Sequence, residues 1–246
     1  MSVMWRALDR IPWKLWGPLM RMRWRSTDAA AFRKRNVGGN SYVDPSVQIF
    51  GWQNVTVGKC TAVSEDVWLN ASVRGAQHDR IVIGDFCHIG RRNYFSTGGL
   101  IHIEDFGFTG LDCHFLGCAH NMDSPLIPYL ASGLTAGAPI ELGVNCWLTT
   151  AVTVLEGVRI GRGSVIGARS VVTGSIPPFS IAVGNPCRVV KRFDFKNHRW
   201  VAAGQFDAEL EKFAPAEEEY RSELVRAFGS LRPALHASSA RFGWLK

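Results

Sequence analysis

The residues from Leu142 to Pro177 repeat with a period of six, and this repeat predicts the fold. It reads LGVNCW, LTTAVT, VLEGVR, IGRGSV, IGARSV and VTGSIP, six hexads without a break. Every hexad opens with an aliphatic residue, and its fifth position holds Val or a smaller residue except at Ile176. Neither the helical period of 3.6 nor the strand period of 2 gives a repeat of six. Short strands that turn a corner every six residues do, with one large and one small side chain pointing inward from each side.

The same repeat extends toward the N-terminus. Reading in sixes from Val57, Ile83 and Ile103 yields nine more hexads, and of all fifteen only the one at Thr109 does not open with an apolar residue. Three sides make one coil of 18 residues, and residues 43–54 add part of a leading coil. The sequence therefore predicts five stacked coils, at 57–74, 83–100, 103–120, 142–159 and 160–177.

Three of the six cysteines fall in the small inward slot of their hexads: Cys87, Cys113 and Cys146. Cysteine in such a slot behaves as a compact apolar residue, so core packing is expected for them. No CxxC pair or zinc-finger spacing is present, and a disulfide framework is not expected in a chain of this length without an export signal.

Charge and hydropathy exclude several classes of function. The net charge of +7 resides entirely in residues 1–35, so the rest of the chain is formally neutral and not a general nucleic-acid binder. No apolar run reaches the roughly 20 residues that a membrane span needs, and the N-terminus lacks the pattern of a secretory signal. A cytoplasmic location, with contact to the inner face of a membrane as an option, is expected.

The largest break in the repeat is the segment 121–141, NMDSPLIPYLASGLTAGAPIE, which starts directly after His120. Irregular loops on a rigid scaffold often carry catalytic residues. A neutral imidazole can take a hydroxyl proton near pH 7, which makes His120 the candidate general base. Asp123 either orients that histidine, binds the acceptor or caps the turn that opens the loop.

Several motifs between Tyr42 and Phe193 resemble those of the hexapeptide-repeat acyltransferases. The segment 119–123 (AHNMD) resembles the family's His-x-x-Asp, and 145–150 (NCWLTT) its Trp-bearing coil. The segment 166–173 (IGARSVVT) is similar to its last full coil, and 184–191 (GNPCRVVK) to its closing Gly-Asn-Pro segment. This resemblance implies a left-handed parallel β-helix, a homotrimer with active sites between neighbouring subunits, and acetyl-CoA as donor.

The resemblance also assigns the coenzyme-binding positions. It places Trp147, Thr150 and Ala168 along the pantetheine groove, and Thr173, Arg188 and Lys191 near the nucleotide, with no metal. The chain departs from the family pattern at Gly174, where a lysine is usual. It also departs at the acceptor site, where Thr97 stands in place of an expected asparagine although Asn93 is near. A simple free disaccharide is therefore not the expected acceptor.

The two ends lie outside the repeat. Residues 1–40 form a basic arm whose tryptophans are Trp5, Trp13, Trp16 and Trp24; it is expected to cap the open end of the coils, to touch a membrane surface, or both. Residues 41–193 are the expected catalytic domain. Residues 194–246 are expected to be a helical extension, with helices at 197–213 and 216–228 parted by Pro215.

The leading hypothesis is an acetyl-CoA-dependent O-acetyltransferase acting on a sugar hydroxyl in surface or exopolysaccharide biosynthesis. The alternatives are N-acetylation of an amino-sugar, a non-catalytic trimeric scaffold, and a zinc hydratase of the same fold. The last would use His78, His114 and His120. However, His114 and His120 are spaced His-x5-His rather than the His-x4-His of such enzymes, which disfavours zinc.

Overall fold

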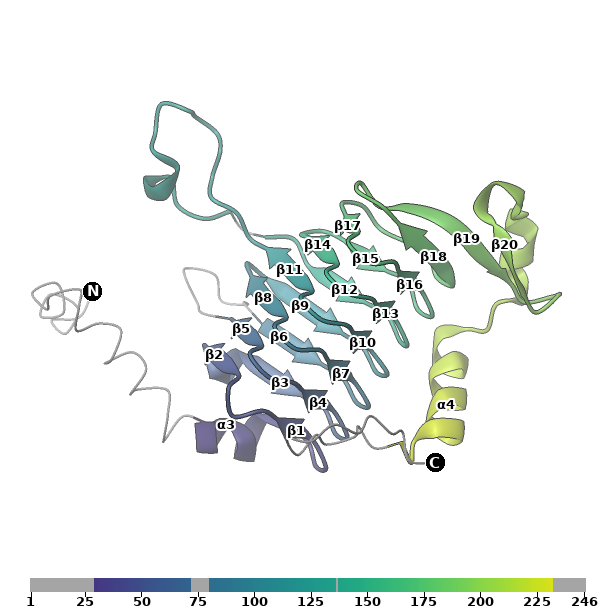
Figure 1. Ribbon diagram of the computed structural model, residues 1–246, viewed down its shortest axis with the longest axis horizontal. Coiled ribbons are helices and arrows are strands. Elements are labelled where there is room, and N and C mark those ends of the chain that lie inside the picture. The colour runs from purple at the N-terminus through teal and green to yellow at the C-terminus, as the bar shows by residue number, and fades with distance from the viewer. Residues whose placement is uncertain (1–28, 72–79, 136, 232–246) are drawn as a thin grey trace, which may run out of the picture.

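The computed structural model describes residues 29–71, 80–135 and 137–231. The four tryptophans of the N-terminal arm, its predicted membrane contact and His78 lie outside these residues. The strands of the described chain lie in three sheets, which are shown in Figure 1. Within the same residues, no helix combines the length and apolar character that a membrane crossing would require.

The nine-stranded sheet begins with short parallel strands and ends with two antiparallel ones. Its strands are, in spatial order, β1 (Tyr42–Val43), β4 (Ala62–Val63), β7 (His88–Ile89), β10 (Phe108–Thr109), β13 (Trp147–Leu148), β16 (Val165–Ile166), β18 (Ser180–Val183), β19 (Arg188–Asp194) and β20 (Arg199–Ala202).

The other two sheets are parallel throughout. The six-stranded sheet contains β2 (Gln48–Phe50), β5 (Trp68–Asn70), β8 (Tyr94–Thr97), β11 (His114–Gly117), β14 (Thr153–Leu155) and β17 (Val171–Val172). The five-stranded sheet contains β3 (Val55–Val57), β6 (Arg80–Ile83), β9 (Leu100–Ile103), β12 (Ile140–Leu142) and β15 (Arg159–Ile160).

The chain visits the three sheets in turn. Each strand from β1 to β14 pairs in parallel with the strand three places further along the chain. Consecutive strands therefore lie in different sheets, and the chain turns a corner between them, as the hexads predict. The fourth position of nine hexads, from Cys60 to Arg169, forms these corners with a left-handed backbone, φ between 54° and 60°.

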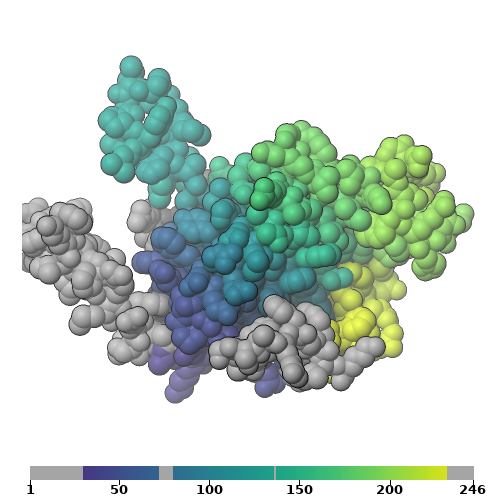
Figure 2. Space-filling model, viewed as in Figure 1, coloured from purple at the N-terminus to yellow at the C-terminus, as the bar shows by residue number. Residues whose placement is uncertain are grey.

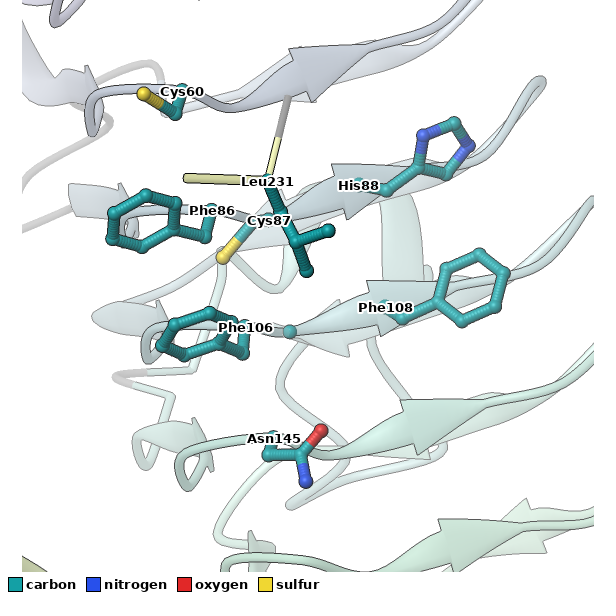
Figure 3. A pocket seen from close by; sticks show the side chains of 9 residues that line it. Cys60, Phe86, Cys87, His88, Phe106, Phe108, Asn145 and Leu231 are labelled. Carbon is teal, nitrogen blue, oxygen red and sulfur yellow. The ribbon is translucent and has the colours of Figure 1, made fainter. Parts of the chain in front are cut away.

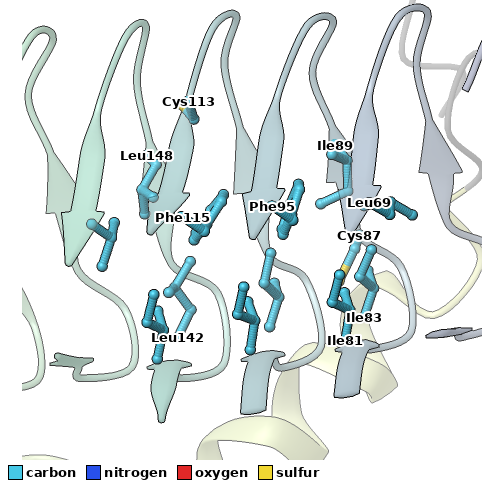
Figure 4. Packing of buried hydrophobic residues seen from close by; sticks show 14 of the residues in the cluster. Leu69, Ile81, Ile83, Cys87, Ile89, Phe95, Cys113, Phe115, Leu142 and Leu148 are labelled. Carbon is cyan, nitrogen blue, oxygen red and sulfur yellow. The ribbon is translucent and has the colours of Figure 1, made fainter. Parts of the chain in front are cut away.

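The hexads also predict the core correctly. The first residue of all fifteen, including Thr109, is at most 3% exposed. The Thr109 hydroxyl has a partner inside, because it accepts a hydrogen bond from the Gly90 backbone N–H at 3.0 Å. Figure 4 shows the resulting stack of side chains between the sheets, in which the rings of Phe95 and Phe115 lie 4.3 Å apart.

The three cysteines of the small slot are fully buried, which confirms the prediction for them. Burial raises the pKa of the Cys87 and Cys146 thiols to about 12 and that of Cys113 to about 11. These thiols stay neutral near pH 7 and act as core side chains rather than as reactive groups.

The predicted helix at 197–213 is wrong. This stretch forms β20 and two short 3-10 helices, η4 (Ala203–Gln205) and η5 (Ala208–Phe213). The Asp194 carboxylate accepts hydrogen bonds from the backbone N–H groups of Lys196 and Asn197 and from the Asn197 amide, which turns the chain back on itself. β20 then pairs with β19, so pairing with the end of the sheet overrides local helix propensity.

The predicted second helix is present as α4 (Glu217–Phe228), which packs on the exterior of the coils. The Arg221 guanidinium donates to the carboxylates of Asp105 and Glu104 at 2.6 and 2.7 Å, and the Asn145 amide donates to the Tyr220 hydroxyl at 2.6 Å. At the other end of the coils, α3 (Ala29–Asn36) buries Phe32 in the core.

Candidate active site

The segment after β11 leaves the coils as a long loop. It projects from the body of the molecule in Figure 2 (teal) and returns at β12. Its root is a short antiparallel ribbon: the Asn121 N–H donates to the Gly133 carbonyl at 3.0 Å, and the Thr135 N–H donates to the Ala119 carbonyl at 2.8 Å. His120 and Leu134 face each other between these two bonds, and the His120 side chain is exposed.

Asp123 lies three residues into the loop and is exposed. No hydrogen bond or ion pair in the described part of the chain joins its carboxylate to His120. The turn is instead capped by Asn121, whose side-chain oxygen accepts a hydrogen bond from the Asp123 backbone N–H at 2.9 Å. The amide of Asn121 therefore has the turn-capping role that the sequence offered as one option for Asp123.

The loop carries large apolar side chains in solvent. Leu126 and Leu130 are 92% and 90% exposed, and Met122, Ile127, Tyr129 and Leu134 are at least 40% exposed. The segment 121–141 contains no Lys or Arg. An apolar patch of this kind on a projecting loop marks a contact surface.

The predicted donor-side residues gather on the nine-stranded sheet. Trp147 pairs with Val165, Val165 with Ile181 and Ile181 with Lys191, so Trp147 and Lys191 lie in one row across four neighbouring strands. Both are exposed on the outer face. With strands about 4.8 Å apart, the row spans roughly 14 Å from the backbone of Trp147 to the backbone of Lys191.

Three other predicted residues lie near this row. Thr150 and Ala168 are exposed in the turns that follow β13 and β16, and the Arg169 N–H donates to the Thr150 carbonyl at 2.9 Å. Arg188 opens β19 and is exposed. Thr173 does not join them, because it follows β17 in the six-stranded sheet.

The row continues past Trp147 with aromatic rings that the sequence reading missed. Phe108 stacks on Trp147 at 5.8 Å, and His88 meets Phe108 edge-on at 5.5 Å. All three occupy the sixth position of the first hexad in their coils. That shared slot is the signal that could have identified them.

A small pocket adjoins this aromatic row at the corner between the nine-stranded and five-stranded sheets. Figure 3 shows Phe86 and Phe106 on one side of it and His88 and Phe108 on the other. The cavity measures about 160 Å³, and Asn145 and Leu231 complete its walls. The rings of Phe86 and Phe106 stack at 4.9 Å and form its apolar floor.

His120 and Trp147 do not meet within one chain. His120 follows the six-stranded sheet and precedes the five-stranded one, so it lies at the corner opposite the nine-stranded sheet that carries Trp147. The predicted base and the predicted donor groove therefore lie on opposite sides of the stacked coils.

The structure does not bring the candidate acceptor-site and zinc-site residues into a common site. Asn93 is 1% exposed and donates to the Gly110 carbonyl at 2.8 Å, so it belongs to the core and not to an acceptor site. His114 lies on β11 with its ring against Tyr94. Across residues 29–71, 80–135 and 137–231, no three His, Cys, Asp or Glu side chains are grouped to hold a metal ion.

Comparison with known proteins identifies the family. The chain is 32% identical over 177 residues to the candidate colanic acid biosynthesis acetyltransferase WcaF of Escherichia coli K12, and the match covers 72% of this chain and 79% of WcaF. The chain belongs to the hexapeptide-repeat acetyltransferases. A candidate acetyltransferase of Staphylococcus aureus strain COL is 43% identical over 114 residues, which are 46% of this chain. The matched region spans only 56% of that relative's length.

Solved structures agree on the fold. AntD, an N-acyltransferase from Bacillus cereus solved in complex with dTDP and 3-hydroxybutyryl-CoA, superposes with a TM-score of 0.57 at 16% identity, covering 84% of this chain and 99% of AntD. No family model matches the chain. As a member of the hexapeptide-repeat acetyltransferases, the chain shares the family's mostly parallel β architecture with few helices.

Proposed function

We propose that this hexapeptide-repeat protein is an acetyl-CoA-dependent O-acetyltransferase that acts on a sugar hydroxyl, with His120 as general base. Membership of the family carries the proposal, because the matched relatives are named acetyltransferases. We further propose that residues 41–193 wind as a left-handed β-helix and form the catalytic unit, between the arm 1–40 and the extension 194–246.

The reaction needs one base and one groove. The neutral imidazole of His120 takes the proton of the acceptor hydroxyl as its oxygen attacks the thioester carbonyl. The tetrahedral intermediate collapses, the carbon–sulfur bond breaks, and the leaving thiolate of coenzyme A receives the proton from the imidazolium. The acetyl group ends as an ester on the sugar, and the histidine returns to its neutral form.

The donor would lie along the outer row of the nine-stranded sheet. Trp147 and the turns at Thr150 and Ala168 offer a groove for the pantetheine arm, and Arg188 and Lys191 offer charge for the coenzyme's phosphates. Thr173 follows β17 of the six-stranded sheet, and we propose that it lies near the nucleotide of a donor bound to a neighbouring copy. The AntD structures hold coenzyme A or an acyl-CoA, which supports the same donor class here.

We infer that each active site is shared between two copies of the chain in a homotrimer. His120 lies opposite Trp147 within one chain, and this separation supports a site to which a neighbouring copy contributes the other half. The uncharged apolar surface around Leu126 and Leu130 supports this proposal, because contact with a neighbouring copy would remove it from water.

Mixing two inactive variants tests the shared site. His120→Ala keeps the donor groove, and a Trp147→Ala/Lys191→Glu double variant keeps the base. Co-expressed with different tags and purified as mixed assemblies, they should recover roughly a third of wild-type transfer, because every mixed trimer holds one intact pair among its three sites. Each variant purified alone is the control. Mixed assemblies that stay as inactive as the separate variants would contradict the shared site.

The acceptor is proposed to be a glycan or glycan precursor of surface polysaccharide synthesis in the cytoplasm. The name of WcaF, which refers to colanic acid biosynthesis, supports this class. N-acetylation of an amino-sugar is the second candidate, since AntD is an N-acyltransferase. Mild base separates the two, because it releases acetate from an O-acetyl ester and leaves an N-acetyl amide intact.

A further inference from the structure

The backbone of His120 is fixed by the ribbon at the root of the loop. The two backbone bonds that flank His120 and Leu134 make them a non-hydrogen-bonded antiparallel pair. In such a pair the two side chains lie on the same face and close together. The orientation of the His120 side chain therefore depends on how firmly Ala119–Asn121 is held against Gly133–Thr135.

Within the described residues, no carboxylate or amide holds the His120 ring. A general base usually has a second group that orients it, as in the catalytic triads. The ribbon is the structural support that the imidazole has in this chain. One residue of the ribbon contributes more to it than the others do.

That residue is Thr135. Its backbone N–H donates to the Ala119 carbonyl at 2.8 Å. Its hydroxyl accepts from the Ala119 N–H at 3.3 Å and donates to the Ala119 carbonyl at 3.2 Å. Thr135 thus bonds both the backbone N–H and the backbone carbonyl of Ala119, the residue directly before His120. Ser132 closes the distal side, since its hydroxyl donates to the Asn121 carbonyl at 2.6 Å.

We propose that Thr135 is a positioning residue for His120: its side-chain hydroxyl clamps Ala119 and so aims the imidazole at the acceptor. This inference rests on the proposed function of His120. Thr135 is proposed to act through its bonds to Ala119 rather than by contact with substrate. Loss of the hydroxyl should therefore lower turnover without weakening the binding of acetyl-CoA, because the Thr135 hydroxyl bonds Ala119 and none of the residues predicted to bind the donor.

The test compares Thr135→Val, which keeps the shape of the side chain and removes the hydroxyl, with Thr135→Ser, which keeps the hydroxyl. Thr56→Val, on the exposed face of β3, is the matched control. Thr135→Val should lower kcat about tenfold with an unchanged KM for acetyl-CoA, since small displacements of a catalytic group cost that much or more. Thr135→Ser and Thr56→Val should stay within about twofold of wild type.

A spectroscopic measurement accompanies the kinetics. The imidazole carbon–proton NMR signal of His120, assigned with His120→Ala, should be single in wild type and Thr135→Ser and broadened or split in Thr135→Val. An unchanged signal with unchanged kcat in Thr135→Val would overturn the inference. So would an equal loss of kcat in the Val and Ser variants. Wild-type turnover in His120→Ala would instead refute the proposed function, which keeps the two failures distinguishable.

Discussion

The coils and the loop segment 121–135 differ in the exposure of their large apolar side chains. In the coils, large residues such as Phe95 and Phe115 are fully buried and stacked on each other. In the loop, Leu126 and Leu130 are almost fully exposed. The coils bury their own core, whereas the loop presents an apolar surface that a single chain leaves in water.

The proposed chemistry lies at the boundary between these regions. His120 is the last residue of a regular hexad and the middle position of the ribbon strand Ala119–Asn121. The coil gives His120 a rigid support, and the loop provides an apolar surface that a neighbouring copy of the chain can cover. Four sets of variants test this difference between the coils and the loop.

Removal of the imidazole at the boundary should have the largest effect. His120→Ala should lower transfer at least about 100-fold, the usual contribution of a positioned general base. The melting temperature should stay unchanged, because the side chain is exposed. Thiol release from acetyl-CoA in the presence of acceptor measures the first, and calorimetric unfolding the second. Turnover near the wild-type rate would exclude His120 as the base.

A paired truncation contrasts the core of the coils with the tip of the loop. Phe95→Ala should lower the free energy of unfolding by about 3–5 kcal/mol, because it opens a cavity in the stack. Leu130→Ala, at a side chain that is 90% exposed in the single chain, should change it by less than about 0.5 kcal/mol when measured at dilutions that dissociate the assembly. Denaturant unfolding followed by circular dichroism compares the two. Equal losses would show that the loop is part of the same cooperative core.

Making the loop polar should affect assembly rather than folding. Leu126→Ser/Leu130→Ser should leave the far-UV circular dichroism unchanged while reducing the oligomer and, with it, transfer activity. Sedimentation velocity at matched concentrations measures the change in assembly. The single variant Phe50→Ser, on an exposed face of the coil, is the control for loss of surface hydrophobicity. An unchanged oligomer would place the subunit interface elsewhere.

The smallest effects are expected for the cysteine thiols, in their alkylation rates and in the pH dependence of stability. Burial raises the pKa of Cys87 and Cys146 to about 12, and Cys118 is partly exposed. At pH 8 the native protein should therefore alkylate rapidly at one thiol, and Cys118→Ser should remove that reaction. The folded chain holds the buried protons more tightly than the unfolded chain, so stability should fall as the pH rises from about 9 toward 12. Rapid alkylation of several thiols would contradict the buried slots.

The sequence predicted the buried first position of every hexad because the repeat records which side chains face inward. Even Thr109, the one polar first position, is buried, because its hydroxyl accepts a hydrogen bond from the Gly90 N–H. The C-terminal segment has no such repeat. Its helix-favouring composition at 197–213 was overridden by the turn at Asp194 and by pairing with β19, neither of which is a local property of that stretch.

The site was predictable only in part. The position of His120 at the mouth of a long loop is visible in the sequence, and so is the slot of Trp147. Their separation follows from the hexads as well, because His120 ends the third side of one coil and Trp147 ends the first side of the next. Thr135 escaped notice, since its contacts with Ala119 exist only once the ribbon has formed.

Binding of acetyl-CoA is the first requirement of the proposed function, and it can be measured without knowledge of the acceptor. Calorimetric titration of the full chain with acetyl-CoA should show saturable binding at about one site per chain, and His120→Ala should bind equally well. Trp147→Ala/Lys191→Glu should bind more weakly. No heat of binding up to millimolar acetyl-CoA would contradict the assignment of this chain as an acetyl-CoA-dependent transferase.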